Sequence, residues 1–153
     1  MQAVSNRDSL REKINRLERA MLSIVQVDCP VRHYFAPGVY AREITIPGGV
    51  TLVGAIHKTE NIAVLSKGRL VLATEAGPVE ISAPHTLTVK PGDKNSATAL
   101  EDCVWTNFLS NPSNERDIDK LVEIFTESKN SELIGGADNK QLAGNKSAES
   151  IEA

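Results

Sequence analysis

Six side chains in this sequence are of the types that bind small charged molecules: Tyr40, Arg42, His57, Glu60, Lys94 and Trp105. Guanidinium and ammonium groups hold phosphates or carboxylates through charge-assisted hydrogen bonds, and aromatic rings stack on planar ligands. If the fold gathers these residues, they predict a site for a small anionic ligand. In the alternative interpretation, Arg42 and Glu43 point to opposite faces of a strand, solvated or ion-paired, and Trp105 belongs to the core.

Acid–base catalysis has one candidate pair, His57 with Glu60. Other catalytic patterns are missing from the sequence. Gly48-Gly49 precedes an expected strand, whereas a phosphate-binding loop opens a helix, and Ser66 lacks the context of a nucleophile elbow. The sequence therefore favours a protein that is not an enzyme and needs no cofactor.

Length and charge limit the classes of partner. The chain has 153 residues, which suggests one domain with extended ends, and a formal net charge of only -3. That charge predicts neither nucleic-acid nor membrane binding. No apolar run reaches membrane-spanning length, and the polar start of the chain lacks the apolar core of a signal peptide.

The two cysteines, Cys29 and Cys103, match no zinc-binding or redox spacing. We expect two buried thiols. A disulfide stays open as an alternative, because geometry and not sequence decides it.

Residues 9–25 are predicted to form a helix, since Ser9 and Glu12 have the spacing of a capping box. Apolar residues then follow at spacings of 4, 3, 4 and 3, namely Leu10, Ile14, Leu17, Met21 and Ile24. This is a two-heptad seam. It could lie on the chain's own domain or pair with copies of itself. We expect residues 1–28 to self-associate, as a dimer or a trimer.

From Val31 the apolar period changes to 2, and turn signals such as Pro91-Gly92 recur every few residues. About eight or nine short strands up to Leu109 predict an antiparallel sandwich or barrel. Within it, residues 51–56 and 62–66 are expected to pair as a hairpin.

A second helix is expected over residues 117–127, where four apolar residues form one stripe: Ile118, Leu121, Val122 and Phe125. It would pack across the barrel or against a neighbouring subunit. Residues 29–128 then make up the β domain with its helix. Residues 129–153 are rich in Ser, Asn, Lys, Gly and Ala and predict a flexible tail.

Residues 47–68 resemble the first conserved motif of cupins, G-x5-H-x-H-x3,4-E-x6-G, and residues 90–95 resemble the second, P-x-G-x2-H. The resemblance implies a mostly β fold, a jelly-roll or double-stranded β-helix barrel. In metal-dependent cupins three histidines and a glutamate hold a metal ion. The matching positions here are Ala55, His57, Asn61 and Asn95. With one ligand in four, no metal is expected.

A broader resemblance, over residues 31–128, is to small cupin-like proteins of tailed bacteriophages. It rests on the segments 32–43, 56–60, 65–68 and 99–106, and on Lys94 after the second-motif proline. It implies a protein present in the host cytoplasm during infection or in the virion. We expect a non-enzymatic virion or assembly component, such as a capsid decoration or head-associated protein that contacts capsid proteins.

Two alternatives stay open. One is a small-ligand binder, for example one that sequesters a host signalling nucleotide to counter antiphage defence. The other is a degenerate cupin epimerase or isomerase that uses His57.

Overall fold

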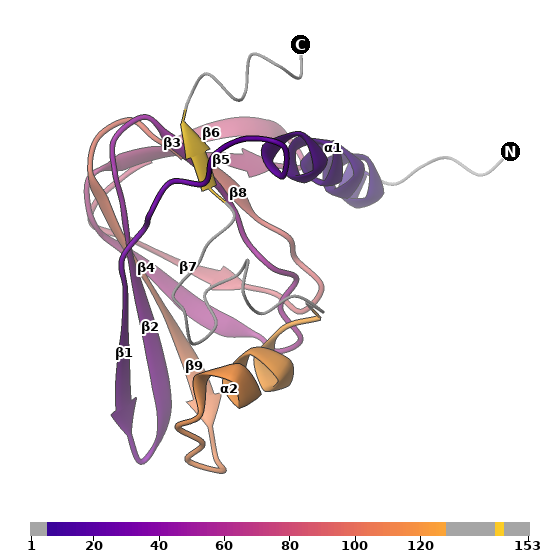
Figure 1. The fold of residues 1–153 in the computed structure, drawn as a ribbon. Coiled ribbons are helices and arrows are strands. Elements are labelled where there is room, and N and C mark those ends of the chain that lie inside the picture. The colour runs from indigo at the N-terminus through magenta and orange to yellow at the C-terminus, as the bar shows by residue number, and fades with distance from the viewer. Residues whose placement is uncertain (1–5, 128–142, 146–153) are drawn as a thin grey trace, which may run out of the picture.

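Two five-stranded antiparallel sheets form a barrel in the computed structural model, which describes residues 6–127 and the backbone of residues 143–145 (Figure 1). The first sheet has the order β1 (Val31–Ala36), β2 (Gly38–Ile46), β9 (Cys103–Asn111), β4 (Asn61–Lys67) and β7 (His85–Val89). The second has the order β10 (Ala143–Asn145), β3 (Val50–Val53), β8 (Ser96–Ala99), β5 (Arg69–Thr74) and β6 (Gly77–Ser82). The predicted mostly β barrel with a helix at each end of the domain is confirmed.

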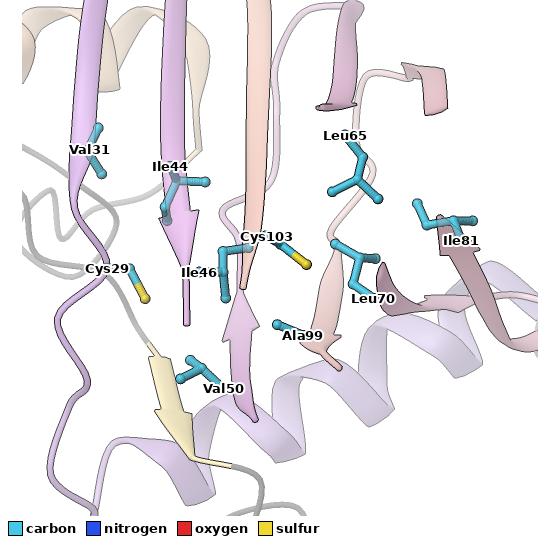
Figure 2. Close-up of a cluster of buried hydrophobic side chains, with 10 residues drawn as sticks. All are labelled: Cys29, Val31, Ile44, Ile46, Val50, Leu65, Leu70, Ile81, Ala99 and Cys103. Atoms are coloured by element: carbon cyan, nitrogen blue, oxygen red, sulfur yellow. The ribbon is translucent and has the colours of Figure 1, made fainter. Parts of the chain in front are cut away.

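The core fills the space between the sheets because every second strand residue points inward. Along β2, for example, Tyr40, Ile44 and Ile46 are all buried. Figure 2 shows ten residues of the main apolar cluster, contributed by both sheets and by the segment before β1.

Both cysteines belong to this cluster and are free thiols, as expected (Figure 2). Burial, reinforced by the charge of Asp28, raises the pKa of Cys29 to about 11. Burial also raises the pKa of Cys103, whose Sγ donates a hydrogen bond to the Arg69 carbonyl oxygen at 3.1 Å. Neither group is therefore an activated thiolate at neutral pH.

The predicted hairpin between residues 51–56 and 62–66 is wrong. β3 lies in the second sheet and pairs with β8, whereas β4 lies in the first sheet between β9 and β7. The seven residues between the two strands cross from one sheet to the other. Turn-forming residues mark where a strand ends, but they do not say which strand the next one will pair with.

The N-terminal helix α1 spans Asn6–Met21, so it begins before Ser9 and ends before Ile24. Ser9 is therefore not its cap. The hydroxyl of Ser23 and the amide of Gln26 donate to the carbonyl oxygens of Ala20 and Met21, at 2.7 and 2.8 Å. These bonds satisfy carbonyl groups that the end of a helix leaves without partners.

The apolar seam of α1 packs on the barrel. Ile14 and Met21 are buried against Val53 of β3, with Leu10 and Leu17 beside them. Of the two alternatives for this seam, the structure places it on the chain's own domain. Self-association through the seam stays a prediction, and it would require the helix to leave this surface.

The second helix, α2, spans Ile118–Phe125 and lies at the far end of β9 from α1 (Figure 1). The side chain of Asp117 caps it by accepting from the amides of Asp119 and Lys120. The predicted apolar stripe packs across the barrel, with Leu121 and Phe125 against Tyr40 and Leu109.

The predicted flexible tail lies largely outside the described residues. Its described part, β10, pairs with β3 and is thus not the unstructured segment that composition suggested. Neither helix in the described part of the chain is long and apolar enough to cross a membrane.

Candidate functional site

A cavity of about 110 Å³ lies inside the barrel, at the end that α2 covers. Its walls come from both sheets, from the loop before β4 and from α2. The lining residues are Tyr40, Arg42, Ile44, Ile46, Leu52, Gly54, Ala55, His57, Leu70, Leu72, Asn95, Ala97, Trp105, Asn107, Leu109, Leu121, Val122, Phe125 and Thr126. The site is thus mostly apolar with a few polar groups, as is common for small-molecule sites.

Arg42 supplies the charge in this cavity. It lies on the inward face of β2, in register with Asn107 of β9. Burial lowers the pKa of the guanidinium, and the nearby Tyr40 acts in the opposite direction. An arginine starts from so high a pKa that it stays protonated at neutral pH. Arg42 and Glu43 lie on opposite faces of β2, and Trp105 packs against the core, as the alternative interpretation held, but Arg42 lines the cavity.

His57 lies in the crossing segment between β3 and β4, and backbone bonds fix its position. The carbonyl oxygen of His57 accepts a hydrogen bond from the Gly92 amide at 2.8 Å, and the backbone of His57 forms a β-bridge with Thr126. Its buried Nδ1 has no hydrogen-bond partner among the described residues. Burial, and then the charge of Arg42, lower the pKa of the ring, while Asp93 acts to raise it. The imidazole is therefore neutral at pH 7.

A chain of amide groups runs along the wall beside Arg42. The indole Nε1 of Trp105 donates to Asn107 Oδ1 at 2.9 Å, and Asn107 Nδ2 donates to Asn61 Oδ1 at 2.8 Å. The Asn61 amide in turn donates to the Thr59 carbonyl oxygen at 3.2 Å. These bonds set the amide orientations and hold Trp105 in place at the cavity wall.

Tyr40 is held by rings on both sides, because it stacks with Phe35 at 5.2 Å and with Phe125 at 6.1 Å between ring centroids. Its hydroxyl lies 2.7 Å from Nδ1 of His33. Burial raises the pKa of Tyr40 to about 12, so the phenol is neutral over the physiological range.

The cavity mouth is closed by α2 and the chain that follows it. The amide of Lys58 donates to the Phe125 carbonyl oxygen at 2.8 Å, and the amide of Glu127 donates to the Ile56 carbonyl oxygen at 2.9 Å. The helix and the His57 segment therefore form one cover over the barrel end.

Four of the six predicted ligand-binding residues meet at this cavity: Tyr40, Arg42, His57 and Trp105. Glu60 does not. It is exposed, and the cavity lining excludes it, because the chain turns outward after His57 before Asn61 enters β4. The proposed His57–Glu60 acid–base pair is therefore not assembled in this structure.

Lys94 is also absent from the cavity. Its side chain is only 8% exposed, and its ammonium group pairs with the carboxylate of Glu18 in α1 and donates to Asn15 Oδ1 at 2.8 Å. Lys94 is therefore bonded to α1 and does not reach this cavity, and its contact with an anionic ligand stays a prediction. Arg7 and Arg11 of α1 also donate to the same loop, to the carbonyl oxygens of Pro91 and Gly92.

The four positions aligned with cupin metal ligands do gather here. Ala55, His57 and Asn95 line the cavity, and Asn61 is bonded to the lining residue Asn107. Only His57 offers a side chain of the kind that divalent transition metals prefer. Among the residues the structure describes, no three His, Cys, Asp or Glu side chains are grouped to hold a metal. This donor set does not fit a divalent ion.

Sequence reasoning missed Asn107 and His33. Asn107 could have been found, since it is two residues from Trp105 in one strand and so shares its face. His33 gave no such signal, because its contact with Tyr40 depends on the register of β1 on β2.

The burial of His57 predicts a pH dependence of stability. In the unfolded chain this ring takes up a proton near pH 6.5, whereas in the folded chain its pKa is lower. The unfolded state therefore binds more protons just below pH 6.5, and the free energy of unfolding falls as the pH drops through this range. Urea unfolding at about pH 7.5 and about pH 5.5 measures the loss.

We expect His57→Gln to lose less stability than the parent chain over the same pH interval. The matched control is His85→Gln, at an exposed histidine. An unchanged pH dependence in His57→Gln would contradict the assignment of this effect to the cavity histidine.

Comparison with known proteins supports the fold. Neither a protein-family model nor a curated protein matches the sequence. Among solved structures, salicylate 1,2-dioxygenase from Pseudoaminobacter salicylatoxidans is similar at a TM-score of 0.53 and 11% identity, over 77% of this chain and 36% of that one.

KdgF from a Halomonas species is similar at a TM-score of 0.49 and 17% identity, over 62% of this chain and 88% of that one. An RmlC-like cupin from Shewanella frigidimarina is similar at a TM-score of 0.47 and 14% identity, over 61% of this chain and 83% of that one. At these identities the likeness is one of fold alone. The chain has a mostly β fold with antiparallel sheets and a helix at each end of the domain, and this fold is similar to part of the dioxygenase.

Proposed function

We propose that this protein binds a small organic anion, most simply a monocarboxylate, inside its barrel. One observation carries the proposal. Arg42 is the one side chain among the described lining residues that is ionised at neutral pH, and these residues include no Asp or Glu. The described part of the lining is therefore positively charged and mostly apolar, and in such surroundings the attraction between opposite charges is stronger than in water.

The groups around Arg42 suit a carboxylate. A guanidinium presents a planar fork of donors that matches the two carboxylate oxygens. Asn107 lies in register with Arg42, and Ile44 and Trp105 form the next inward-facing pair along the same strands. A ligand with its carboxylate at Arg42 would thus place its hydrocarbon part against Ile44 and the neighbouring leucines.

The size of the cavity narrows the ligand class. Its volume is about 110 Å³, smaller than an engineered cavity of about 150 Å³ that admits benzene and far below the roughly 300 to 1,000 Å³ of sites for drug-sized ligands. This favours an acid of about four to six carbon atoms. It argues against a nucleotide in this cavity.

Binding without catalysis is the simpler interpretation of these side chains. Among the lining residues, only His57 has an ordinary pKa close to neutrality, and the carboxylate once expected to pair with it, Glu60, lies outside. General acid–base catalysis usually needs a second positioned group. A metal-free isomerase reaction that uses His57 alone is the enzymatic alternative.

The first function expected from the sequence, a virion or assembly component, stays a prediction. No contact among the described residues bears on capsid proteins. Mass spectrometry of purified particles tests it, and absence of the chain from virions would exclude it.

A thermal-shift screen tests the proposed function. The full chain is melted with straight and branched monocarboxylic acids of increasing length, each matched with the primary alcohol and the amide of the same carbon skeleton. A ligand that binds the folded state alone raises the melting temperature. We expect stabilisation by one or more acids and none by their neutral partners. Equal effects of acids and alcohols, or no effect of any acid, would overturn the proposal.

A further inference from the structure

The outer face of the first sheet is unusually apolar for a surface. Register places five outward-facing residues in one row across all five strands: Tyr34, Ala41, Phe108, Ile62 and Thr88. Of these, Tyr34 is 48% exposed, Ile62 is 49% exposed and Phe108 is 43% exposed. An antiparallel sheet with one face in water usually presents polar side chains there.

The next row on the same face is uncharged over its last three strands. It consists of Arg32, Glu43, Thr106, Val64 and Thr86. Its two charges are of opposite sign and lie in register with each other at the edge of the sheet. We call these two rows the apolar sheet face.

The second sheet differs on its outer side. There Arg69 of β5 and Glu80 of β6 form an ion pair at 2.7 Å, and α1 covers Val53 of β3. One sheet therefore has a charged or helix-covered exterior. The other has an apolar exterior over which no described element packs.

We infer that the apolar sheet face is the contact surface for a second copy of this chain. Its three most exposed apolar side chains, with Val39 in β2 at 42% exposure, leave on the order of 400 Å² open, within the range of the largest patch on a typical monomer. The exposed members of the adjoining row, Arg32 and Thr86, enlarge this open area toward the roughly 800 Å² per partner that a stable interface takes.

The charge of this face permits a second copy as the partner. Each copy carries a net charge of -3, which opposes association, but this face holds one cation and one anion and is neutral as a whole. Two such faces meet without net repulsion. The central strand of the sheet, β9, contributes Phe108, so a two-fold axis near this strand would bring the largest apolar side chains of both copies together. Sheets pack face to face at a separation of about 10 Å.

The second copy would bind at the apolar sheet face and not at the apolar seam of α1, because that seam is already packed on the barrel. It is independent of the cavity and its ligand, because Phe108 and Ile62 point away from the barrel interior. A dimer and a binding site could each exist without the other.

Sedimentation equilibrium of the full chain tests it. We expect a dimer, and we expect Phe108→Glu to weaken association by at least about 30-fold, the effect of losing one interface hot spot. Ile62→Lys at the same face should act in the same way. Circular dichroism melts of both variants establish that they fold, which their exposed positions favour.

Two matched control variants replace an exposed apolar residue with glutamate outside the apolar sheet face. Val79→Glu alters β6 of the other sheet at 44% exposure, and Leu22→Glu alters the segment after α1 at 53% exposure. Both should leave the dimer intact. A monomer at every concentration, a trimer, or a dimer that Leu22→Glu disrupts while Phe108→Glu does not would overturn the inference.

Discussion

Replacing Arg42 with methionine should weaken the binding of the best acid from the thermal-shift screen by at least about 30-fold, since losing one partner of a buried charge pair costs about 2–5 kcal/mol. Methionine has a similar length and keeps the cavity filled, but it offers neither charge nor donors. The bound carboxylate would then lie in an apolar enclosure with no opposite charge among the described lining residues.

Isothermal titration calorimetry with the parent chain and the variant measures this loss. Arg42→Lys keeps the charge without the planar fork and should fall between the two. The matched control is Arg19→Met, which removes a positive charge from the exposed side of α1 and should leave the affinity unchanged. If Arg42→Met binds the acid as tightly as the parent chain, Arg42 does not hold the carboxylate.

Replacing Gly68 with alanine is expected to lower the free energy of unfolding by about 3 kcal/mol or more. Gly68 links β4 of one sheet to β5 of the other at a φ of +88°. A Cβ there would overlap the Asp102 carbonyl oxygen and would lie 2.7 Å from the Sγ of Cys103. Asp102 directly precedes β9, and Cys103 is the first residue of that strand, with its side chain buried in the core.

Gly77→Ala is the matched control for this prediction. Gly77 has a φ of +110°, and a Cβ there would meet no atom within 4 Å, so the variant should lose only the backbone contribution of about 1–2 kcal/mol. Urea unfolding of both variants separates steric overlap from backbone strain. Equal losses in the two variants would show that the approach of Asp102 and Cys103 does not matter.

The sequence predicted the elements better than their pairing. The alternation of Tyr40, Ile44 and Ile46 marked β2, and the stripe of Ile118 to Phe125 marked α2, because both signals are local. The sequence could not predict which strands pair with β3 and β4. Their pairing is set by closure of two sheets, and the turn residues between them look the same in a hairpin and in a crossing segment.

The candidate site was predicted in part for the same reason. Arg42 shares the inward period of β2, so its place in the cavity follows from the strand pattern alone. Lys94 was also predicted to line the site, but it pairs instead with Glu18, which lies 76 residues away in the chain. No local pattern signals such a contact. Glu60 was predicted to face the site, but it lies in the short segment of residues 58–60 before β4 and is exposed. The direction of such a segment depends on where β4 begins.

Trp105 offers the most direct test of the central claim. It is the chain's only tryptophan, it lines the cavity, and its indole N–H donates to Asn107. Its single indole resonance in a proton–nitrogen NMR spectrum therefore reports on the cavity. On titration with the best monocarboxylate we expect this resonance to shift and saturate, with no shift when the alcohol of the same skeleton is added. A resonance that does not respond to any acid of the series would contradict anion binding in the barrel.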